Sequence, residues 1–98
     1  MKALISKRAT RAADRIDARW RAYADDPGIF AREFLEAVER LETTQGLGSP
    51  FPTASHTALR RILLPKSRCH VYFEIDEAKQ TIKILHIWDG RREHAPKL

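Results

Sequence analysis

Apolar residues recur every three or four positions through residues 9–45, which is the spacing of two amphipathic helices. The apolar stripe of the first helix consists of Ala9, Ala13, Ile16, Trp20 and Tyr23. The stripe of the second helix consists of Phe30, Phe34, Ala37, Val38 and Leu41. Because only a short Asp-Asp-Pro-Gly segment separates the stripes, we expect the helices to lie antiparallel as a helical hairpin.

The residues at the ends of these helices are typical of helix caps. Ser6 or Thr10 caps the first helix, and Asp26 is the expected N-cap of the second, with Pro27 at its first helical position. One of the two glycines at positions 46 and 48 is expected to end the second helix.

The rest of the chain has the period-two pattern of strands. Residues 2–6 predict a short first strand, and residues 46–58 a loop rich in Gly, Ser, Pro and Thr. Three strands are then expected over residues 59–64, 68–75 and 81–88. The last is apolar on both faces, which is typical of a central, covered strand. The order β-α-α-β-β-β predicts an α+β fold, with the helical hairpin packed on a small, mostly antiparallel sheet.

Length and charge refine this picture. A chain of 98 residues suits one domain, 1–98, with one small core and a short basic tail at 89–98. The net charge is +5, but it is unevenly distributed: residues 1–24 carry +5, residues 25–55 carry −4, and residues 56–98 carry +4. If folding gathers the two basic segments, their surface would suit nucleic acid, a nucleic-acid enzyme or an acidic protein, although a merely solvated surface has the same composition.

Several classes of protein are not expected. The single cysteine, Cys69, lies on the apolar face of its strand and predicts a buried, unreactive thiol in a reducing cytoplasm. The histidines lack metal-ligand spacing, and we expect no metal and no cofactor. No apolar run reaches the ~20 residues that a membrane span needs, so no membrane association is expected.

The polar face of the carboxy-terminal sheet carries the candidate chemistry. Its candidate residues are Arg61, Arg68, His70, Tyr72 and His94. Arginine neutralises phosphate and a general base takes a 2′-hydroxyl proton, so such a face is suited to cleave RNA without metal. The same residues equally suit a basic protein interface, or a solvent-facing strand without function.

Three segments of the sequence resemble the RelE/ParE toxin superfamily of bacterial type II toxin–antitoxin systems. They are the arginine-rich strand 59–64, the strand 68–76, and the closing strand 82–92, which runs into Trp88 and the pair Arg91-Arg92. Ser6-Lys7-Arg8-Ala9 also resembles the opening of family members. The resemblance implies a toxin held neutral by a cognate antitoxin.

Two activities occur in this superfamily, and the residues favour one of them. RelE-like members cleave messenger RNA on the ribosome, whereas ParE-like members poison DNA gyrase. Asp89 follows Trp88 where nuclease relatives often carry histidine, and a carboxylate there would repel RNA phosphate. No tyrosine follows Arg92, and the long hairpin resembles ParE. We therefore expect a gyrase inhibitor that acts by binding through Trp88, Arg91 and Arg92, although Trp88 equally suits core packing.

The alternative implied by the resemblance is a RelE-like nuclease. In it Arg68 would stabilise the phosphate, His70 or His94 would act as acid or base, and Tyr72 or Arg61 would support them. A family member with the fold but little toxicity is the third possibility.

The expected partner is a ParD-like antitoxin whose disordered segment folds onto the toxin. Such a segment needs an apolar groove and a basic rim. The predicted groove lies between the helical hairpin and the sheet edge, near Ile16, Trp20, Tyr23, Phe30 and Phe34. The predicted rim consists of Arg15, Arg19, Arg60 and Arg61.

Overall fold

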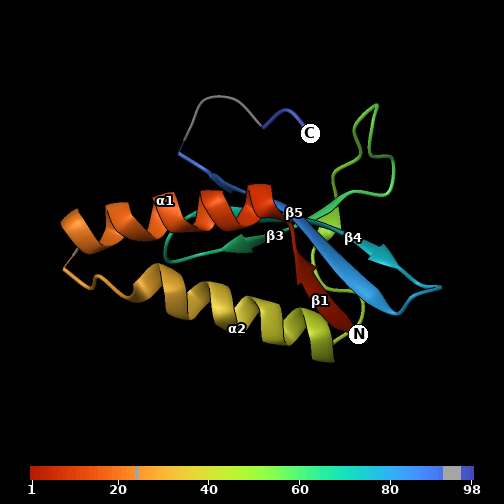
Figure 1. Ribbon diagram of the computed structural model, residues 1–98, viewed down its shortest axis with the longest axis horizontal. Helices are drawn as coiled ribbons and strands as arrows, with labels where there is room; N and C mark the ends of the chain where they lie inside the picture. Colours follow the sequence, from red (N-terminus) through yellow and green to blue (C-terminus); the bar gives the residue numbers. More distant parts are fainter. Residues whose placement is uncertain (24, 92–95) are drawn as a thin grey trace.

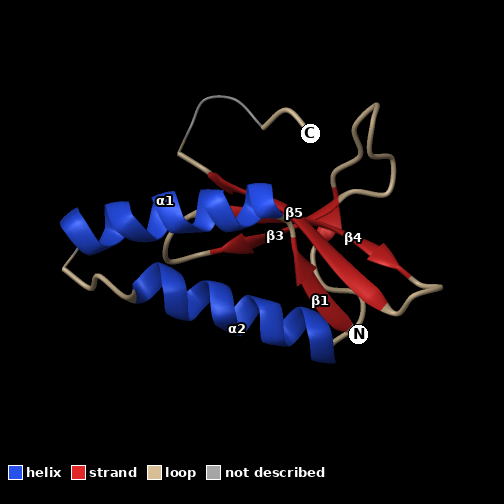
Figure 2. Cartoon of the chain, in the orientation of Figure 1, coloured by secondary structure: helices blue, strands red, loops and turns tan. Residues whose placement is uncertain are grey.

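The computed structural model describes residues 1–23, 25–91 and 96–98, with the side chain of Tyr23 outside the description. The elements are β1 (Lys2–Ile5), α1 (Lys7–Tyr23), α2 (Ile29–Thr43), β2 (Ser49–Pro50), β3 (Arg60–Leu64), β4 (Cys69–Asp76) and β5 (Thr81–Asp89). The strands form one sheet in the order β1-β5-β4-β3-β2, and the two helices lie side by side over one of its faces (Figures 1 and 2). The predicted α+β fold is confirmed.

The sheet is mostly antiparallel, as expected. The one parallel pair joins the first strand to the last, with Lys2 opposite Thr81 and Ile5 opposite Ile84. The chain then leaves the sheet at Ser6, whose Oγ donates to the carbonyl of Leu85 at 3.0 Å. From Leu85 onward, β1 no longer pairs with β5, and α1 packs beside β5 instead.

A β-bulge in β5 explains why this strand reads as apolar on both faces. Tyr72 pairs with His86, but Phe73 pairs with Ile84, so Leu85 is an extra residue between the two pairs. An extra residue exchanges the faces to which alternate side chains point. Ile84 before the bulge and Ile87 after it consequently both reach the core under the helices. The central position predicted for this strand is correct, and the bulge gives its physical reason.

The helix ends differ from the predicted ones. Ser6 is the cap of α1, because its Oγ accepts a hydrogen bond from the Ala9 amide at 3.0 Å, and α1 begins at Lys7. The prediction that Asp26 caps the second helix is wrong: α2 begins at Ile29 after Gly28, without a side-chain cap. The Asp26 carboxylate instead pairs with Arg32.

Three further features of the elements were not predicted. The second helix ends at Thr43, before either glycine, because Thr44 already has an extended backbone (φ −125°, ψ 120°). The predicted loop contains the short edge strand β2, whose Ser49 pairs with Arg61. β4 begins at Cys69 because Arg68 adopts a positive φ of 60° in the preceding turn.

Two carboxylates of α2 fasten this helix to the sheet. Glu33 accepts hydrogen bonds from the amides of Lys66 (2.6 Å) and Ser67 (2.9 Å) and from the Ser67 hydroxyl (2.7 Å), all in the turn between β3 and β4. Glu42 accepts a hydrogen bond from the Ala3 amide at 2.9 Å and so covers part of the outer edge of β1. The hairpin is thus tied to strands near both edges of the sheet.

We predict that Glu33→Ala destabilises the protein by about 2 kcal/mol, because it leaves the donors of the buried Ser67 without an acceptor. Urea unfolding monitored by circular dichroism measures this change. Glu36→Ala, which removes an exposed carboxylate on the same helix, is the matched control and should change stability by less than about 0.5 kcal/mol. Equal losses for the two variants would contradict the role assigned to Glu33.

Candidate functional site

The sheet face opposite the helices, called here the far face, contains most of the predicted chemistry. The register places on it, from three adjacent strands, Arg61, Leu63, His70, Tyr72, Glu74, His86 and Trp88. Arg61 lies opposite Tyr72, and Tyr72 lies opposite His86. The structure thus brings together three of the five candidate nuclease residues: Arg61, His70 and Tyr72.

Tyr72 does not have the exposure expected for a polar, solvent-facing position. Only 1% of its surface is accessible, because Phe51 packs edge-on against its ring at a centroid distance of 5.5 Å. The guanidinium of Arg61 in turn lies 4.4 Å from the centroid of the Phe51 ring. The expectation of an exposed Tyr72 is therefore wrong, and this ring is part of a small second core on the far face.

His70 keeps partial access to solvent beside this small core. Burial lowers the pKa of its imidazole, and the positive charge of Arg61 lowers it further. The ring centroids of His70 and Tyr72 are 6.2 Å apart. A neutral imidazole is able to accept a proton, so His70 has the charge state that a general base requires at neutral pH.

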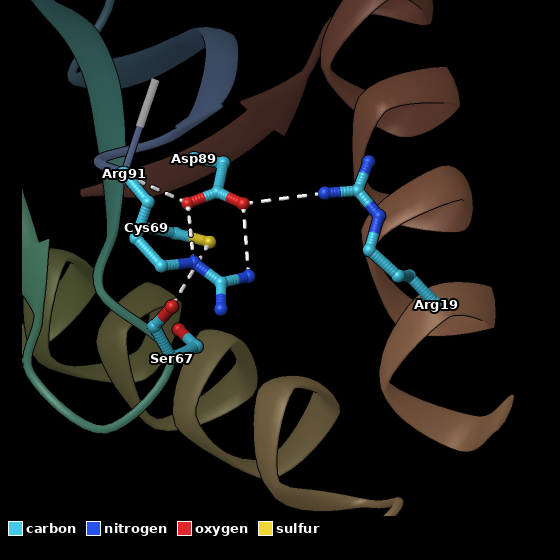
Figure 3. Close-up of polar contacts among 5 residues, drawn as sticks. All are labelled: Arg19, Ser67, Cys69, Asp89 and Arg91. Carbon is cyan, nitrogen blue, oxygen red and sulfur yellow. Dashed lines mark hydrogen bonds and ion pairs between the residues drawn. The ribbon is translucent and has the colours of Figure 1, made fainter. Parts of the chain in front are cut away.

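Asp89 occupies the other prominent polar cluster, at the end of β5 (Figure 3). Its carboxylate lies between two arginines: Arg19 of α1 at 3.2 Å and Arg91 at 3.1 Å. The amide and Nε of Arg91 also donate to Asp89, at 3.0 and 3.2 Å. Burial by itself raises the pKa of Asp89, but these hydrogen bonds and charges outweigh it, and the pKa of Asp89 lies below its usual value.

This geometry corrects the reason for which Asp89 was taken to disfavour RNA cleavage. Asp89 points to the helix side of the sheet, opposite Cys69, and is 8% exposed. Its charge is compensated by two arginines and does not project from the far face. Asp89 therefore fastens α1 to the end of β5 and does not repel a phosphate.

Cys69 lies beneath the same cluster. It is 1% exposed, and burial raises the pKa of its thiol to about 11. Its Sγ lies 3.7 Å from the carbonyl oxygen of Ser67 (Figure 3). The structure thus confirms a buried thiol that stays protonated at neutral pH.

The remaining candidate residues for target binding and catalysis lie near the end of β5. Arg68 is exposed in the turn before β4, and its carbonyl accepts a hydrogen bond from Gly90 at 2.8 Å. Trp88 is half-buried, and its ring centroid is 5.6 Å from that of His86. The guanidinium of Arg91 is half-exposed while it binds Asp89. Arg92 and His94 lie outside the described residues.

The predicted groove residues are divided between the core and a hollow. Ile16, Phe30 and Phe34 are buried in the core and Trp20 is half-buried against it, while the side chain of Tyr23 lies outside the description. Phe30 and Phe34 also line an apolar hollow of about 250 Å³ between the helices, whose most exposed apolar residues are Ile5 and Leu35.

The predicted basic rim is also divided. Arg15 and Arg19 belong to α1, which packs on β5, whereas Arg60 and Arg61 lie two strands away on β3. Consecutive strand residues point to opposite faces, and Arg60 accordingly binds the carbonyl of Gly48 at 2.9 Å while Arg61 lies over Phe51. The carboxylates that line the apolar hollow, Asp14 and Asp17, are instead on the opposite side of α1 from Arg15.

Sequence analysis missed the contribution of the segment between β2 and β3. Phe51 covers Tyr72, and His56 Nδ1 lies 2.7 Å from Glu74 Oε1 on the far face. The only sequence signal was the pair of aromatic and histidine residues in a stretch otherwise rich in Pro, Ser and Thr. Within the described ranges, no group of three metal-ligating side chains occurs, and no helix has the length and apolar character to cross a membrane.

Comparison with known proteins identifies the fold. No protein-family model matches the sequence, and no curated protein matches it either. Among solved structures, a chain of the chromosomal ParDE TA system from P. aeruginosa matches with a TM-score of 0.69 and 18% identity, over 91% of this chain and 95% of that one. The isolated E. coli RelE toxin matches with a TM-score of 0.59 and 14% identity, over 95% of this chain and 87% of that one. The chain therefore has the fold of the RelE/ParE toxin superfamily, which confirms the resemblance at the level of the fold.

We predict that Arg61→Gln raises the pKa of His70, because it removes the nearby positive charge. An NMR titration of the His70 imidazole measures its midpoint. Arg68→Gln, an exposed arginine in the turn before β4, is the control and should leave the midpoint unchanged. An unchanged midpoint in Arg61→Gln would show that Arg61 does not act on His70.

A second prediction concerns Asp89 and pH. The folded-state pKa of Asp89 is below the unfolded value, so its contribution to stability is complete above the unfolded pKa of ~3.9 and is lost as pH falls through the folded pKa. Asp89→Asn should therefore cost about 1–2 kcal/mol at pH 7. The difference in the free energy of unfolding between the wild type and Asp89→Asn should become smaller below about pH 4.

Urea unfolding of the wild type and Asp89→Asn from pH 2.5 to 8 tests this profile. Asp14→Asn, at an exposed position of α1, is the control for loss of one negative charge. A constant difference between the wild type and Asp89→Asn at all pH values would rule out the ionised carboxylate as its cause.

Proposed function

We propose that this protein is the toxin of a type II toxin–antitoxin system and that, like ParE, it inhibits DNA gyrase by binding. The observation that carries the proposal is the similarity of the fold to a chain of the ParDE system, which extends over 91% of this chain and 95% of the other. A match over 91% of the chain includes most of the hairpin of α1 and α2, and its TM-score of 0.69 exceeds the 0.59 of the match to RelE.

The end of β5 is the proposed target-binding surface. Trp88 lies on the far face, and Arg91 follows in the turn after β5, where its half-exposed guanidinium binds Asp89. Aromatic and arginine side chains contribute disproportionately to binding at protein interfaces. Arg92, the next residue in the sequence, belongs to the same proposed surface.

Burial of Tyr72 supports binding over RNA cleavage. A tyrosine that is 1% exposed beneath Phe51 has no access to a phosphate without movement of that ring. His56, which lies near the far face, is hydrogen-bonded to Glu74. The far face is in this respect closed to a nucleotide.

The purified protein should inhibit the supercoiling of relaxed plasmid by gyrase. Trp88→Ala should weaken this inhibition by roughly tenfold or more, as expected for a central aromatic contact. Leu63→Ala, which truncates an exposed apolar residue of the same face, is the matched control. Full supercoiling with the wild-type protein in stoichiometric excess would refute gyrase as the target.

A RelE-like ribosome-dependent nuclease is the second candidate, because His70 beside Arg61 has the lowered pKa that suits a general base. Mapping transcript ends after induction tests it. New ends that disappear in His70→Ala would establish cleavage, whereas intact messages during growth arrest would exclude it.

An antitoxin is the proposed physiological partner, as the ParDE neighbour is itself part of such a system. We assign its apolar anchors to the hollow between α1 and α2, which the predicted residues Phe30 and Phe34 line together with Ile5 and Leu35. Leu35 is 65% exposed and Ile5 43% exposed, so an apolar anchor in this hollow would remove both from water.

A further inference from the structure

The two sides of α1 carry opposite charges. Arg8, Arg11, Arg15 and Arg19 follow one another at helical spacing and form what we call the basic flank. Arg15 and Arg19 line a crevice with Trp88 and Asp89, which places the basic flank beside the end of β5 (Figure 1). Asp14 and Asp17 lie on the side that faces α2, where Asp17 pairs with Arg21 at 2.8 Å. The four arginines of the basic flank thus lie apart from the two aspartates of the same helix.

Most of the positive charge on the basic flank is not compensated. Arg11 and Arg15 are exposed, and in the part of the chain that the structure describes neither pairs with a carboxylate. Arg8 donates to the carbonyl of Lys97 at 2.8 Å, which satisfies a donor without cancelling the charge. Asp89 is shared between Arg19 and a second arginine, so this cluster also remains positive.

The spacing of these charges suits a phosphate backbone. A helix rises ~1.5 Å per residue, so the eleven steps from Arg8 to Arg19 extend over ~16 Å. One strand of B-DNA carries a phosphate every ~3.4 Å along the helix axis, so this length corresponds to about five phosphates. The apolar side of α1 packs into the core, whereas Arg11 and Arg15 are exposed, so the flank is open to follow a strand.

The surroundings of the flank do not suit a folded peptide or a single strand. A segment that folds on binding needs hollows for apolar anchors, yet the crevice beside Arg15 and Arg19 holds only about 40 Å³, little more than one water molecule. The larger apolar hollow lies on the acidic side of α1. Between Lys7 and Arg19 the helix contains no aromatic residue, and Trp88 beside Arg19 is a single half-buried ring, whereas successive unpaired bases stack on several rings.

We propose that the basic flank of α1 is a binding site for duplex DNA, which it contacts through the phosphate backbone without sequence preference. This site adjoins the proposed gyrase-binding surface at Trp88 and consists of different residues, so its binding of DNA is testable without gyrase. Phosphate contacts of this kind position a protein on a duplex and make its affinity depend strongly on salt.

The test is fluorescence anisotropy of a labelled 20-base-pair duplex titrated with the full chain at 50 to 200 mM salt. Replacing Arg11 and Arg15 together by Gln should weaken binding roughly tenfold or more and should reduce the slope of log affinity against log salt by about 2. The control replaces Arg40 and Lys79, two exposed cations away from the flank, by Gln and removes the same charge. Circular dichroism confirms that both double variants fold.

Three outcomes would overturn the proposal. The first is an equal loss of affinity for the duplex in the two double variants, which would show that net charge alone causes the binding. The second is tighter binding of a single strand or an RNA duplex of the same sequence. The third is displacement of the duplex by polyglutamate at an equal concentration of charge, which would assign the flank to an acidic protein.

Discussion

The parallel pairing of β1 with β5 is the constraint on which the other features depend. It joins the two ends of the sequence and makes the last strand central to the sheet. Because β1 ends at Ile5 and α1 begins at Lys7, the helix must start beside Ile84 and continue along the unpaired side of β5. The position of the basic flank, the crevice at Trp88 and the contact of Arg19 with Asp89 all follow from this short connection.

Carboxylates fasten the helical layer at places where the apolar core thins out. Glu33 and Glu42 connect α2 to strands at opposite sides of the sheet, and Asp89 connects the sheet to α1. Charged hydrogen bonds are directional, whereas apolar burial is not. They therefore fix the position of each helix along the sheet in a protein whose single core is small.

Periodicity was sufficient to predict the helices, the strands and the α+β class, because each element turns a regular apolar pattern toward one core. It was insufficient where tertiary contacts decide. Asp26 precedes Pro27 as a helix N-cap would, but its carboxylate pairs with Arg32. Tyr72 occupies a position that the period-two pattern predicts to be exposed, but it is covered by Phe51, twenty-one positions away. The bulge at Leu85 changes which residues face the core, and nothing local in the sequence marks it. Alternation placed Arg61, His70 and Tyr72 on one strand face, as the register shows. Their burial and contacts depend on Phe51 and its neighbours, whose return to that face is not encoded in the spacing of residues.

The separation of charge across α1 has a kinetic meaning. Four arginines on one side, against two aspartates and Arg21 on the other, give the helix a dipole perpendicular to its axis, in addition to the one along it. In the field of a strongly charged partner, such a molecule is turned before contact, so a larger share of collisions begins in a productive orientation. The same asymmetry slows the approach of that partner to the acidic side. The order of arginines and aspartates in one helix thus governs the direction of encounter as well as the strength of the final complex.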